Sequence, residues 1–437
     1  MQNNTSLTIE EALEAFLAKT AAITDTEQVS LLCATGRILA EDVPAPFSVP
    51  SFPKSAMDGY AVRSAEVAGA SKESPVTLRV VGERLAGEET ATGNGVGETE
   101  ETVAEGGLEK AGMVGTDIAG TGDDAAKGTA VRIMTGAEIP GDYDAVVKQE
   151  DTDYGEDRVQ IFGSVKPYQN YCAVGEDIQK GEIVLSEGTR LGRIEIGVLA
   201  SLGYATVAVR RNPKVRIVST GSELCDVDEY TCELPPGKIY NSIAYMLEAS
   251  MQPYGFETAH CICRDDADSI KAAIQSAAAE YDIIITTGGV SVGKKDLIPE
   301  VLSEIGADIR FQRAKIQPGT PTIGSVYQGV PILSLSGNPY AAIANFDLYF
   351  WPLAARLTGC KELIPVIEQA LLASPYDKVN VSRRLLRAYA ENGKVRLPAK
   401  SHASSVLSNL TKCNCYVDLP AGERVQPGDM VIIRRMP

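Results

Sequence analysis

The hydrophobic pattern is most regular between residues 214 and 360. Short apolar runs there alternate with segments whose apolar residues recur at helical spacing. The runs predict strands and the spaced segments predict helices. An alternation of strand and helix is typical of a parallel sheet with helices on both faces. We therefore predict a central α/β domain in this part of the chain.

The flanking regions have a different pattern. Strands are predicted near residues 76–80, 131–134, 145–148 and 159–162, and short strands separated by glycine turns follow Gly359. The first of these regions predicts an inserted β domain, and the second predicts a small C-terminal β domain. At the start of the chain, residues 7–20 and 29–40 both have helical spacing, and Thr8 with Glu11 forms a capping box.

An acidic segment interrupts the inserted β domain. Residues 88–128 contain ten acidic residues, two basic residues and ten glycines. Such a segment buries too little apolar surface to offset its ordering entropy, so we predict a mobile loop. A solvated hairpin extension fits the charge pattern better than an acidic arm that binds a partner.

Composition narrows the class of protein. The 437 residues are 44% hydrophobic and carry a net charge of −17, which indicates a folded protein and argues against binding of nucleic acid or an anionic membrane. No apolar run approaches the roughly 20 residues of a membrane span. The cysteines form no CxxC pair, and no leader pattern is present at the N-terminus, so a cytoplasmic location is expected.

The candidate chemistry lies where predicted strands end. Glycine-containing turns follow three strands, at Thr220–Glu223, Thr287–Gly293 and Ser336–Pro339. Ligands of open α/β sheets bind at the carboxyl ends of strands, and glycine allows backbone amides to approach an anion. Each turn alone also fits ordinary strand-to-helix geometry, but three together favour an anionic ligand.

Charged residues accompany these turns. Lys294, Lys295, Arg264, Arg313 and Lys315 could neutralise a phosphorylated ligand. Carboxylates near the same turns, Glu223, Asp265, Asp266 and Asp296, are typical of a site for a hard divalent cation such as Mg²⁺, although solvated charges and helix caps explain any single one equally well.

A further candidate is the irregular loop around Asp58, in the run Pro50–Val62. Loops of this kind often carry function, although an aspartate that caps its own turn is the structural alternative.

Seven motifs along the chain resemble one known family. They are SAMDGYAV at Ser55–Val62, RIMTGAEIP at Arg132–Pro140, GEDIQKGE at Gly175–Glu182, STGSEL at Ser219–Leu224, TTGGVSVGKKD at Thr286–Asp296, PGTP at Pro318–Pro321 and SLSGNP at Ser334–Pro339. In this order they resemble molybdopterin molybdenumtransferases, which are similar to the C-terminal domain of gephyrin. The match spans nearly the whole chain apart from the acidic segment.

The resemblance implies a multidomain fold of α/β and β parts. A discontinuous linker domain would comprise residues 21–46 and 180–210, and the inserted β domain residues 47–179. Residues 1–20 and 211–360 would form the α/β molybdopterin-binding domain with its central parallel sheet, and residues 361–437 a C-terminal β barrel. The family also implies a homodimer whose cleft lies between subunits, and a possible partnership with the molybdopterin adenylyltransferase.

The implied reaction is insertion of molybdate into adenylylated molybdopterin with release of AMP, assisted by Mg²⁺. Asp265 and Asp296 would hold the metal, with Glu223 nearby. The positions that match functional residues of the family are Asp58, Thr135, Asp177, Glu223, Asp265, Asp296 and Arg313. The positions predicted to bind substrate are Thr220, Gly221, Gly288, Gly289, Ser291, Gly293, Lys295, Lys315, Pro318, Ser336, Gly337, Asn338 and Pro339.

One departure from the family keeps other functions open. Gln317 precedes the PGTP motif where the family usually has lysine, which removes a fixed positive charge. Lys315 could supply that charge, because side chains two residues apart in an extended segment share a face. The alternatives are a non-catalytic protein that binds molybdopterin or serves as a scaffold, and an adenylyltransferase that acts on molybdopterin.

Overall fold

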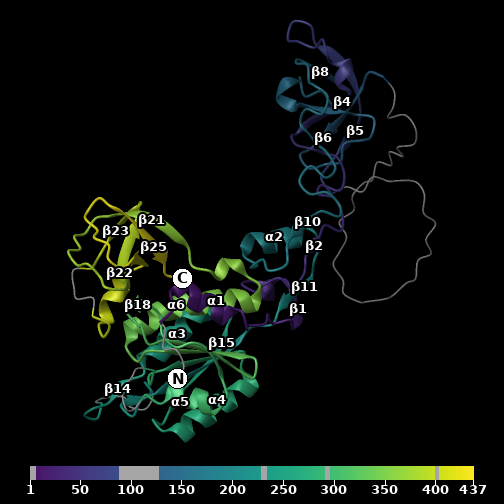
Figure 1. The fold of residues 1–437 in the computed structure, drawn as a ribbon. Helices are drawn as coiled ribbons and strands as arrows, with labels where there is room; N and C mark the ends of the chain where they lie inside the picture. The colour runs from purple at the N-terminus through teal and green to yellow at the C-terminus, as the bar shows by residue number, and fades with distance from the viewer. Residues whose placement is uncertain (1–5, 88–126, 228–233, 291–295, 399–402) are drawn as a thin grey trace, which may run out of the picture. The chain divides into compact units, whose positions relative to one another are not determined.

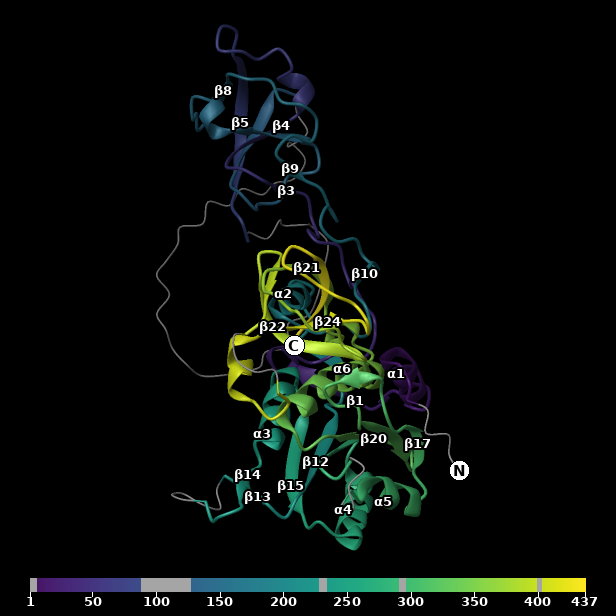
Figure 2. The same ribbon diagram turned by 60° about the vertical axis from the view of Figure 1, so that its left-hand side comes forward.

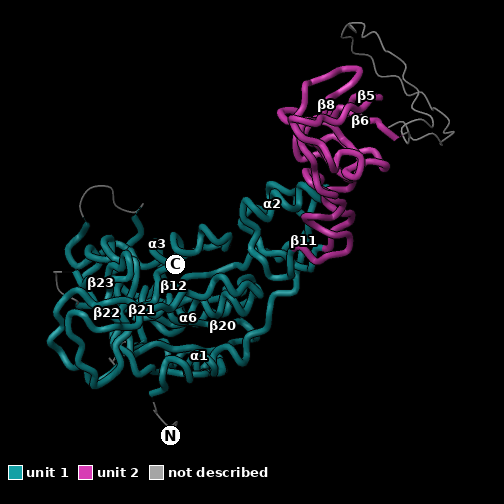
Figure 3. The backbone as a smooth tube through the Cα atoms, turned by 90° about the horizontal axis from the view of Figure 1, so that it is seen from above, with its two compact units in different colours: residues 1–43, 185–437 teal, residues 44–184 magenta. Residues whose placement is uncertain are grey.

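The computed structural model describes residues 6–87, 127–227, 234–290, 296–398 and 403–437. The chain divides into two compact units, which Figure 3 distinguishes by colour. The first comprises Met1–Val43 and Leu185–Pro437, and the second comprises Pro44–Val184. The chain leaves the first unit in β2 (Val43–Pro44) and returns to it in β10 (Ile183–Leu185). The four-domain division expected from the sequence is finer than this split and stays a prediction.

A six-stranded sheet forms the centre of the first unit. Its strands, in spatial order, are β15 (Glu257–Cys263), β12 (Lys214–Thr220), β16 (Ile283–Thr287), β20 (Val330–Leu335), β19 (Ile323–Tyr327) and β17 (Asp308–Phe311). The first four are parallel, as the alternating pattern predicted, β19 runs antiparallel to β20, and β17 pairs antiparallel with β19. All five residues of β16 are buried, because helices cover both faces.

Helices pack on both faces of this sheet, as Figure 1 shows. On one face α1 (Ile9–Leu17), α3 (Ser242–Met251) and α6 (Pro339–Thr358) share one hydrophobic core. On the other face α4 (Ala267–Glu280) and α5 (Ile298–Glu304) share a second core. The predicted capping box of Thr8 and Glu11 begins α1. Helix α6 is buried on nearly all sides, because the next β structure covers the face that the sheet leaves open.

That next structure is a closed barrel. Strands β21 (Ile367–Leu372), β22 (Arg383–Glu391), β23 (Lys394–Arg396), β24 (Cys415–Leu419) and β25 (Met430–Arg435) pair in a ring that β22 and β24 close. Its apolar interior forms a core of its own, and Figure 2 shows the curved strands β21, β22 and β24 of this barrel. The short β18 (Ile316–Gln317) pairs with β22. The predicted combination of a central α/β domain, an inserted β domain and a C-terminal barrel is therefore confirmed.

The predicted helix at residues 29–40 is wrong. Strand β1 (Thr26–Ser30) pairs with β11 (Thr206–Arg210), and only a short turn of 3₁₀ helix follows at Leu32–Ala34. Gly36 then takes the left-handed conformation, with a φ of +80°, which ends any helix. Helix α2 (Arg193–Ser201) precedes β11.

The second unit contains a five-stranded sheet. Its spatial order is β7 (Ala145–Lys148), β4 (Gly59–Val62), β6 (Thr129–Ile133), β5 (Val76–Arg84) and β8 (Arg158–Ile161). A separate pair joins β3 (Lys54–Ser55) to β9 (Tyr171–Cys172). Almost all of the predicted mobile acidic segment, residues 88–126, lies outside the described residues. Among the described helices of the whole chain, none combines the length and the apolar character that a membrane crossing requires.

Candidate functional site

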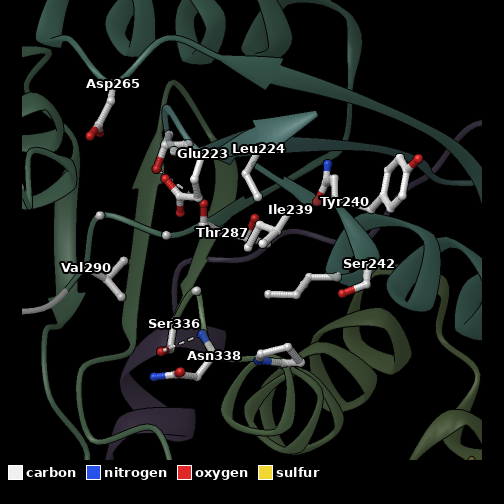
Figure 4. Close-up of a pocket in the computed structure, with 18 of the residues that line it drawn as sticks. Glu223, Leu224, Ile239, Tyr240, Ser242, Asp265, Thr287, Val290, Ser336 and Asn338 are labelled. Atoms are coloured by element: carbon white, nitrogen blue, oxygen red, sulfur yellow. Dashed lines mark hydrogen bonds between the residues drawn. The ribbon is translucent and has the colours of Figure 1, made fainter. Parts of the chain in front are cut away.

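The turns predicted to bind an anion surround one cavity of about 380 Å³. It lies where β12, β16 and β20 end, which are three neighbouring parallel strands. Figure 4 shows Thr287 of the second turn and Ser336 and Asn338 of the third around this space. Parallel strands bring their carboxyl ends to one edge of the sheet, so segments more than 100 residues apart in the sequence meet there.

The turn after β16 depends on glycine. Gly288 has a φ of +89°, and a Cβ atom at this position would lie 2.5 Å from the carbonyl oxygen of Thr220. Its amide donates to the carbonyl of Leu335 at 3.0 Å. Gly288 therefore fits between the ends of β12 and β20, and a side chain would push the two turns apart.

The turn after β20 opens directly into α6. Asn338 occupies the N-cap position in an extended conformation, without a capping bond from its side chain, and Pro339 occupies the first helical position. Ser336 Oγ accepts a hydrogen bond from the amide of Asn338 at 3.2 Å, which Figure 4 marks. The N-terminus of this 20-residue helix thus borders the cavity, and the positive end of the helix dipole favours an anionic ligand.

The turn after β12 leads into a two-stranded ribbon that the sequence pattern did not reveal. Strand β13 (Leu224–Cys225) pairs with β14 (Ile239–Tyr240), and the carbonyl of Glu223 accepts from the amide of Ile239 at 2.9 Å. Leu224, Ile239 and Tyr240 give the cavity an apolar wall. A ligand in the cavity would meet the strand-end turns on one side and these apolar side chains on the other.

A chain of buried polar groups lies under the cavity. Thr287 Oγ1 donates to Ser219 Oγ at 3.0 Å, and the side-chain Nδ2 of Asn241 donates to the same oxygen at 3.1 Å. Asn241 also caps α3, because its Oδ1 accepts from the amide of Ala244. These bonds join β12, β16 and α3 at one point, so the three elements are held in a fixed arrangement.

Carboxylates from three segments line the cavity: Glu223, Asp265 and Asp296. In Figure 4, Glu223 lies close to Thr287, and Asp265 lies at the outer edge. The neighbouring Asp266 has a different role, because it caps α4 by accepting from the amide of Ser269 at 2.8 Å. Hydrogen bonds from this backbone amide and from the Ser269 hydroxyl lower the pKa of Asp266.

The expected cations that the structure describes do not line the cavity. Among the described residues that line it, none is lysine, arginine or histidine. Ser291, Gly293 and Lys295 lie outside the described residues, as does Lys294. The cavity lining does not include Arg313, Lys315 or Pro318. The backbones of Arg313 and Lys315 instead bond to Leu7, at 3.1 and 2.7 Å.

An arginine from the barrel lies beside the position where the family usually has lysine. Arg384 Nη1 donates to Gln317 Oε1 at 3.2 Å, because β18 pairs with β22. Lys315 and Gln317 are both exposed and Ile316 between them is buried, so the two polar side chains share a face, as predicted. The contact with Arg384 was not foreseeable, because it joins residues 67 positions apart.

Asp58 and Thr135 lie together in the second unit. Asp58 Oδ1 accepts from the backbone amide and from the hydroxyl of Thr135, both at 2.7 Å, and these bonds lower the pKa of Asp58. Both residues line an open pocket of about 500 Å³ together with Lys148. Asp58 therefore does more than cap its own turn, because its partner Thr135 is 77 positions away in the sequence. Asp177 is exposed and is not part of that lining.

Comparison with known proteins matches the N-terminal region and the central α/β region of the chain to one family. Residues 7–203 match the family model described as the MoeA N-terminal region (domain I and II), and residues 216–356 match the model described as a probable molybdopterin binding domain. The molybdopterin molybdenumtransferase of Staphylococcus epidermidis is 33% identical over 428 residues, which cover 97% of this chain and 94% of that protein. The enzyme of the same name from Staphylococcus aureus is 34% identical, over 91% of this chain and 87% of its own length.

Solved structures agree with this match. The crystal structure of a molybdopterin biosynthesis moeA protein from Pyrococcus horikoshii superposes with a TM-score of 0.79 and 28% identity, and it covers 99% of this chain and 100% of that chain. The motifs quoted above, the three strand-end turns and these matches agree with one another. The chain belongs to the molybdopterin molybdenumtransferase family.

Proposed function

We propose that this protein inserts molybdate into adenylylated molybdopterin and releases AMP. The observation that carries the proposal is the meeting of three strand-end turns, a helix N-terminus and three carboxylates around one cavity. A pterin phosphate joined to AMP presents phosphate groups between two ring systems. The amides of the turns suit the phosphates, and the wall of Leu224, Ile239 and Tyr240 suits a ring.

Asp265 and Asp296 would hold Mg²⁺, with Glu223 nearby. The three carboxylates are hard oxygen donors that line the same cavity, which fits this ion. Among the described residues, no three His, Cys, Asp or Glu side chains are grouped closely enough to form a metal centre alone. This also fits Mg²⁺, which commonly takes one or two protein carboxylates and completes its shell with phosphate oxygens and water. When bound, the ion would neutralise charge on the phosphoanhydride as AMP leaves.

The chain's own residues would bind and orient the nucleotide. Gly289 and Gly337 would present backbone amides to the phosphates, Ser336 would offer its hydroxyl group, and Thr220 and Gly288 would line the same wall. The buried bonds under the cavity keep these groups in place before substrate arrives.

Asp58 and Asp177 would order molybdate or an attacking water, with Thr135 holding Asp58, in a homodimer in which these residues of one subunit serve the cavity of its partner. The support is the family motif around each residue and the close bond between Asp58 and Thr135. Mixing two inactive variants, Asp58→Ala and Asp296→Ala, should restore about a quarter of the activity if subunits exchange freely, because only mixed dimers contain an intact site. The absence of restored activity in dimers shown to be mixed would contradict this arrangement.

A second candidate is a pterin-binding protein without turnover, and Gln317 is the observation that favours it. In the proposed enzyme, Arg384 beside Gln317 and Lys315 on the same face would supply the positive charge. Wild-type protein that binds adenylylated molybdopterin tightly yet releases no AMP with molybdate and Mg²⁺ present would favour the second candidate. A gain of turnover in Gln317→Lys would then identify the missing charge as the cause.

The decisive experiment follows AMP. Purified protein is incubated with adenylylated molybdopterin and Mg²⁺, with and without molybdate. AMP release should require molybdate, should stop when the metal is chelated, and should be lost in Asp296→Ala. Glu300→Ala is the matched control, because Glu300 is an exposed carboxylate in the first turn of α5, outside the cavity lining. Unchanged turnover in Asp296→Ala would remove the metal assignment, and molybdate-independent cleavage would contradict the proposed reaction.

A further inference from the structure

A histidine is held between two carboxylates beside the cavity. His260 lies on β15, with Nε2 3.0 Å from Asp226 Oδ2 and Nδ1 3.1 Å from Glu248 Oε1. Tyr245 packs on the ring, with centroids 4.9 Å apart, and its hydroxyl donates to Asp226 Oδ1. Both ring nitrogens can donate hydrogen bonds at once only in the imidazolium form. The geometry therefore suits a charged histidine with a carboxylate at each nitrogen.

The cluster joins two elements of the cavity wall. Asp226 directly follows β13, whose Leu224 lines the cavity. Tyr245 and Glu248 belong to α3, whose first residues also line the cavity. The four residues of the cluster are not part of that lining. The cluster thus fixes β13 against α3 from behind the wall.

We propose that His260 is a positioning residue, which ties the β13 segment to α3 and thereby sets the affinity of the cavity for its pterin nucleotide. This inference rests on the proposed function, since the substrate named is the one proposed for the cavity. Glu223 is three residues from Asp226 and is the carboxylate whose placement depends most directly on this contact. If Asp226 lost its contact with His260, both the apolar wall and Glu223 would become free to move relative to α3.

The contact is sensitive to pH. Burial acts to lower the pKa of His260, but the hydrogen bonds that its ring donates to Glu248 and Asp226 outweigh this effect, so the pKa is raised above its usual value. Among the described residues, the titratable groups that contact the ring are Tyr245 and Glu248 from α3 and Asp226 from the segment after β13, while β12 presents the uncharged Ile217 in register. Because the pKa is raised, the tie is complete below the ordinary pKa of a histidine and is lost as the pH rises through the raised value.

His260→Gln tests the inference. The glutamine amide can donate to one carboxylate but presents its oxygen to the other, so the tie is half broken without a large change of volume. We expect the KM for adenylylated molybdopterin in molybdate-dependent AMP release to rise about tenfold, the factor that one charge-assisted hydrogen bond supplies, with kcat changed less than about twofold. Wild-type KM should rise as the pH increases above the ordinary pKa of a histidine, and the variant's KM should stay flat over the same range.

The matched control is Glu257→Gln, which removes an exposed charge from the same strand and should leave KM and its pH profile unchanged. Tyr245→Phe is a second variant that removes only one hydroxyl from the cluster, and it should raise KM about threefold. Unchanged KM and an unchanged pH profile in folded His260→Gln would overturn the inference. If His260→Gln does not fold, an unchanged KM in Tyr245→Phe would overturn it.

Failure of the proposed function is a separate result. In that case the wild type releases no AMP, and the inference is tested by titrating the same variants with adenylylated molybdopterin and measuring the Kd. A wild-type Kd that rises above neutral pH, with a flat Kd in His260→Gln, supports the positioning role without turnover. An equal Kd in both proteins at every pH refutes it.

Discussion

A buried aspartate in the middle of α6 should make the stability of the protein depend on pH. The carboxylate of Asp347 accepts from Trp351 Nε1 at 3.1 Å and from the hydroxyl of Tyr416, in the barrel, at 2.6 Å. Its side chain is buried between the helix and the barrel. Burial raises the pKa of Asp347 to about 7, although the two hydrogen bonds act to lower it. Ionisation of Asp347 therefore places a charge inside this contact.

The size of the effect follows from linkage. The usual pKa of an aspartate is about 3.9, so between about pH 4 and pH 7 the native state holds a proton that the unfolded chain has released. Native Asp347 binds the proton more tightly, and stability falls as the pH rises through this window and levels off above it. Over the whole window the loss is about 4 kcal/mol, and between pH 5.5 and pH 8.5 it is about 2 kcal/mol.

Asp347→Asn removes the ionisation and keeps the shape of the side chain. We expect the variant to lack the fall in the free energy of unfolding, so that its stability relative to the wild type increases by about 2 kcal/mol from pH 5.5 to pH 8.5. Urea unfolding followed by tryptophan fluorescence measures this directly, because Trp351 is the single tryptophan of the chain and donates to Asp347.

The control is another buried aspartate with the opposite electrostatics. Asp418 is paired with Arg383 and Arg434, each at 2.7 Å. Burial acts to raise the pKa of Asp418, but these bonds outweigh it and the pKa is lowered. Asp418→Asn should therefore destabilise the protein at pH 7, by about 3 kcal/mol. A difference between wild type and Asp347→Asn that stays constant from pH 5.5 to pH 8.5 would refute the reasoning about Asp347.

Three further predictions concern the site. Gly288→Ala should abolish AMP release, because the added Cβ would collide with the end of β12. The control is Gly306→Ala: Gly306 also has a left-handed backbone, but no atom lies close to the position of an added Cβ, so this variant should keep its activity and lose only about 1 kcal/mol of stability, as melting will measure. Asp265→Ala should lower AMP release by at least about 100-fold and leave the melting temperature unchanged. Asp266→Ala should leave turnover unchanged and lower the free energy of unfolding by about 1 kcal/mol, because α4 loses its N-cap. Asp58→Asn should lower turnover by the same factor from pH 5 to 9, because the lowered pKa of Asp58 keeps it ionised throughout, and a factor that changes with pH would contradict this.

The sequence predicted those parts of the site that rest on local rules. The turns at Thr287–Gly289 and Ser336–Pro339 follow apolar strands, and the topology of a parallel sheet brings such turns together whatever their distance in the chain. The capping box of α1 and the first turn of α6 were visible for the same reason. The helix predicted for residues 29–40 does not form, because Val29 pairs with β11, about 180 positions away in the sequence. This pairing outweighs the local helical spacing.

The parts that the sequence did not predict depend on pairings between distant residues. The ribbon of β13 and β14 consists of two strands of two residues each, too short to produce an alternating pattern. Asn241 looked like any polar residue before a helix, yet it joins Ser219 beneath the cavity. Arg384 reaches Gln317 only because the barrel packs against the α/β region. Such contacts become visible only once the chain has folded.

The charges around the cavity bear on how it could bind a polyanion. Glu223, Asp265 and Asp296 oppose a phosphate, and at an effective dielectric constant of about 20 two like charges about 5 Å apart repel by about 3 kcal/mol. Backbone amides and the dipole of α6 offset part of this repulsion, but each is a partial charge. Among the described residues no side-chain cation lines the cavity, so the balance depends on a bound divalent ion and on cations that approach from outside that lining. With the proposed Mg²⁺, a site built in this way would bind the proposed nucleotide weakly until the metal is present, which would couple metal binding to substrate binding before any chemistry begins.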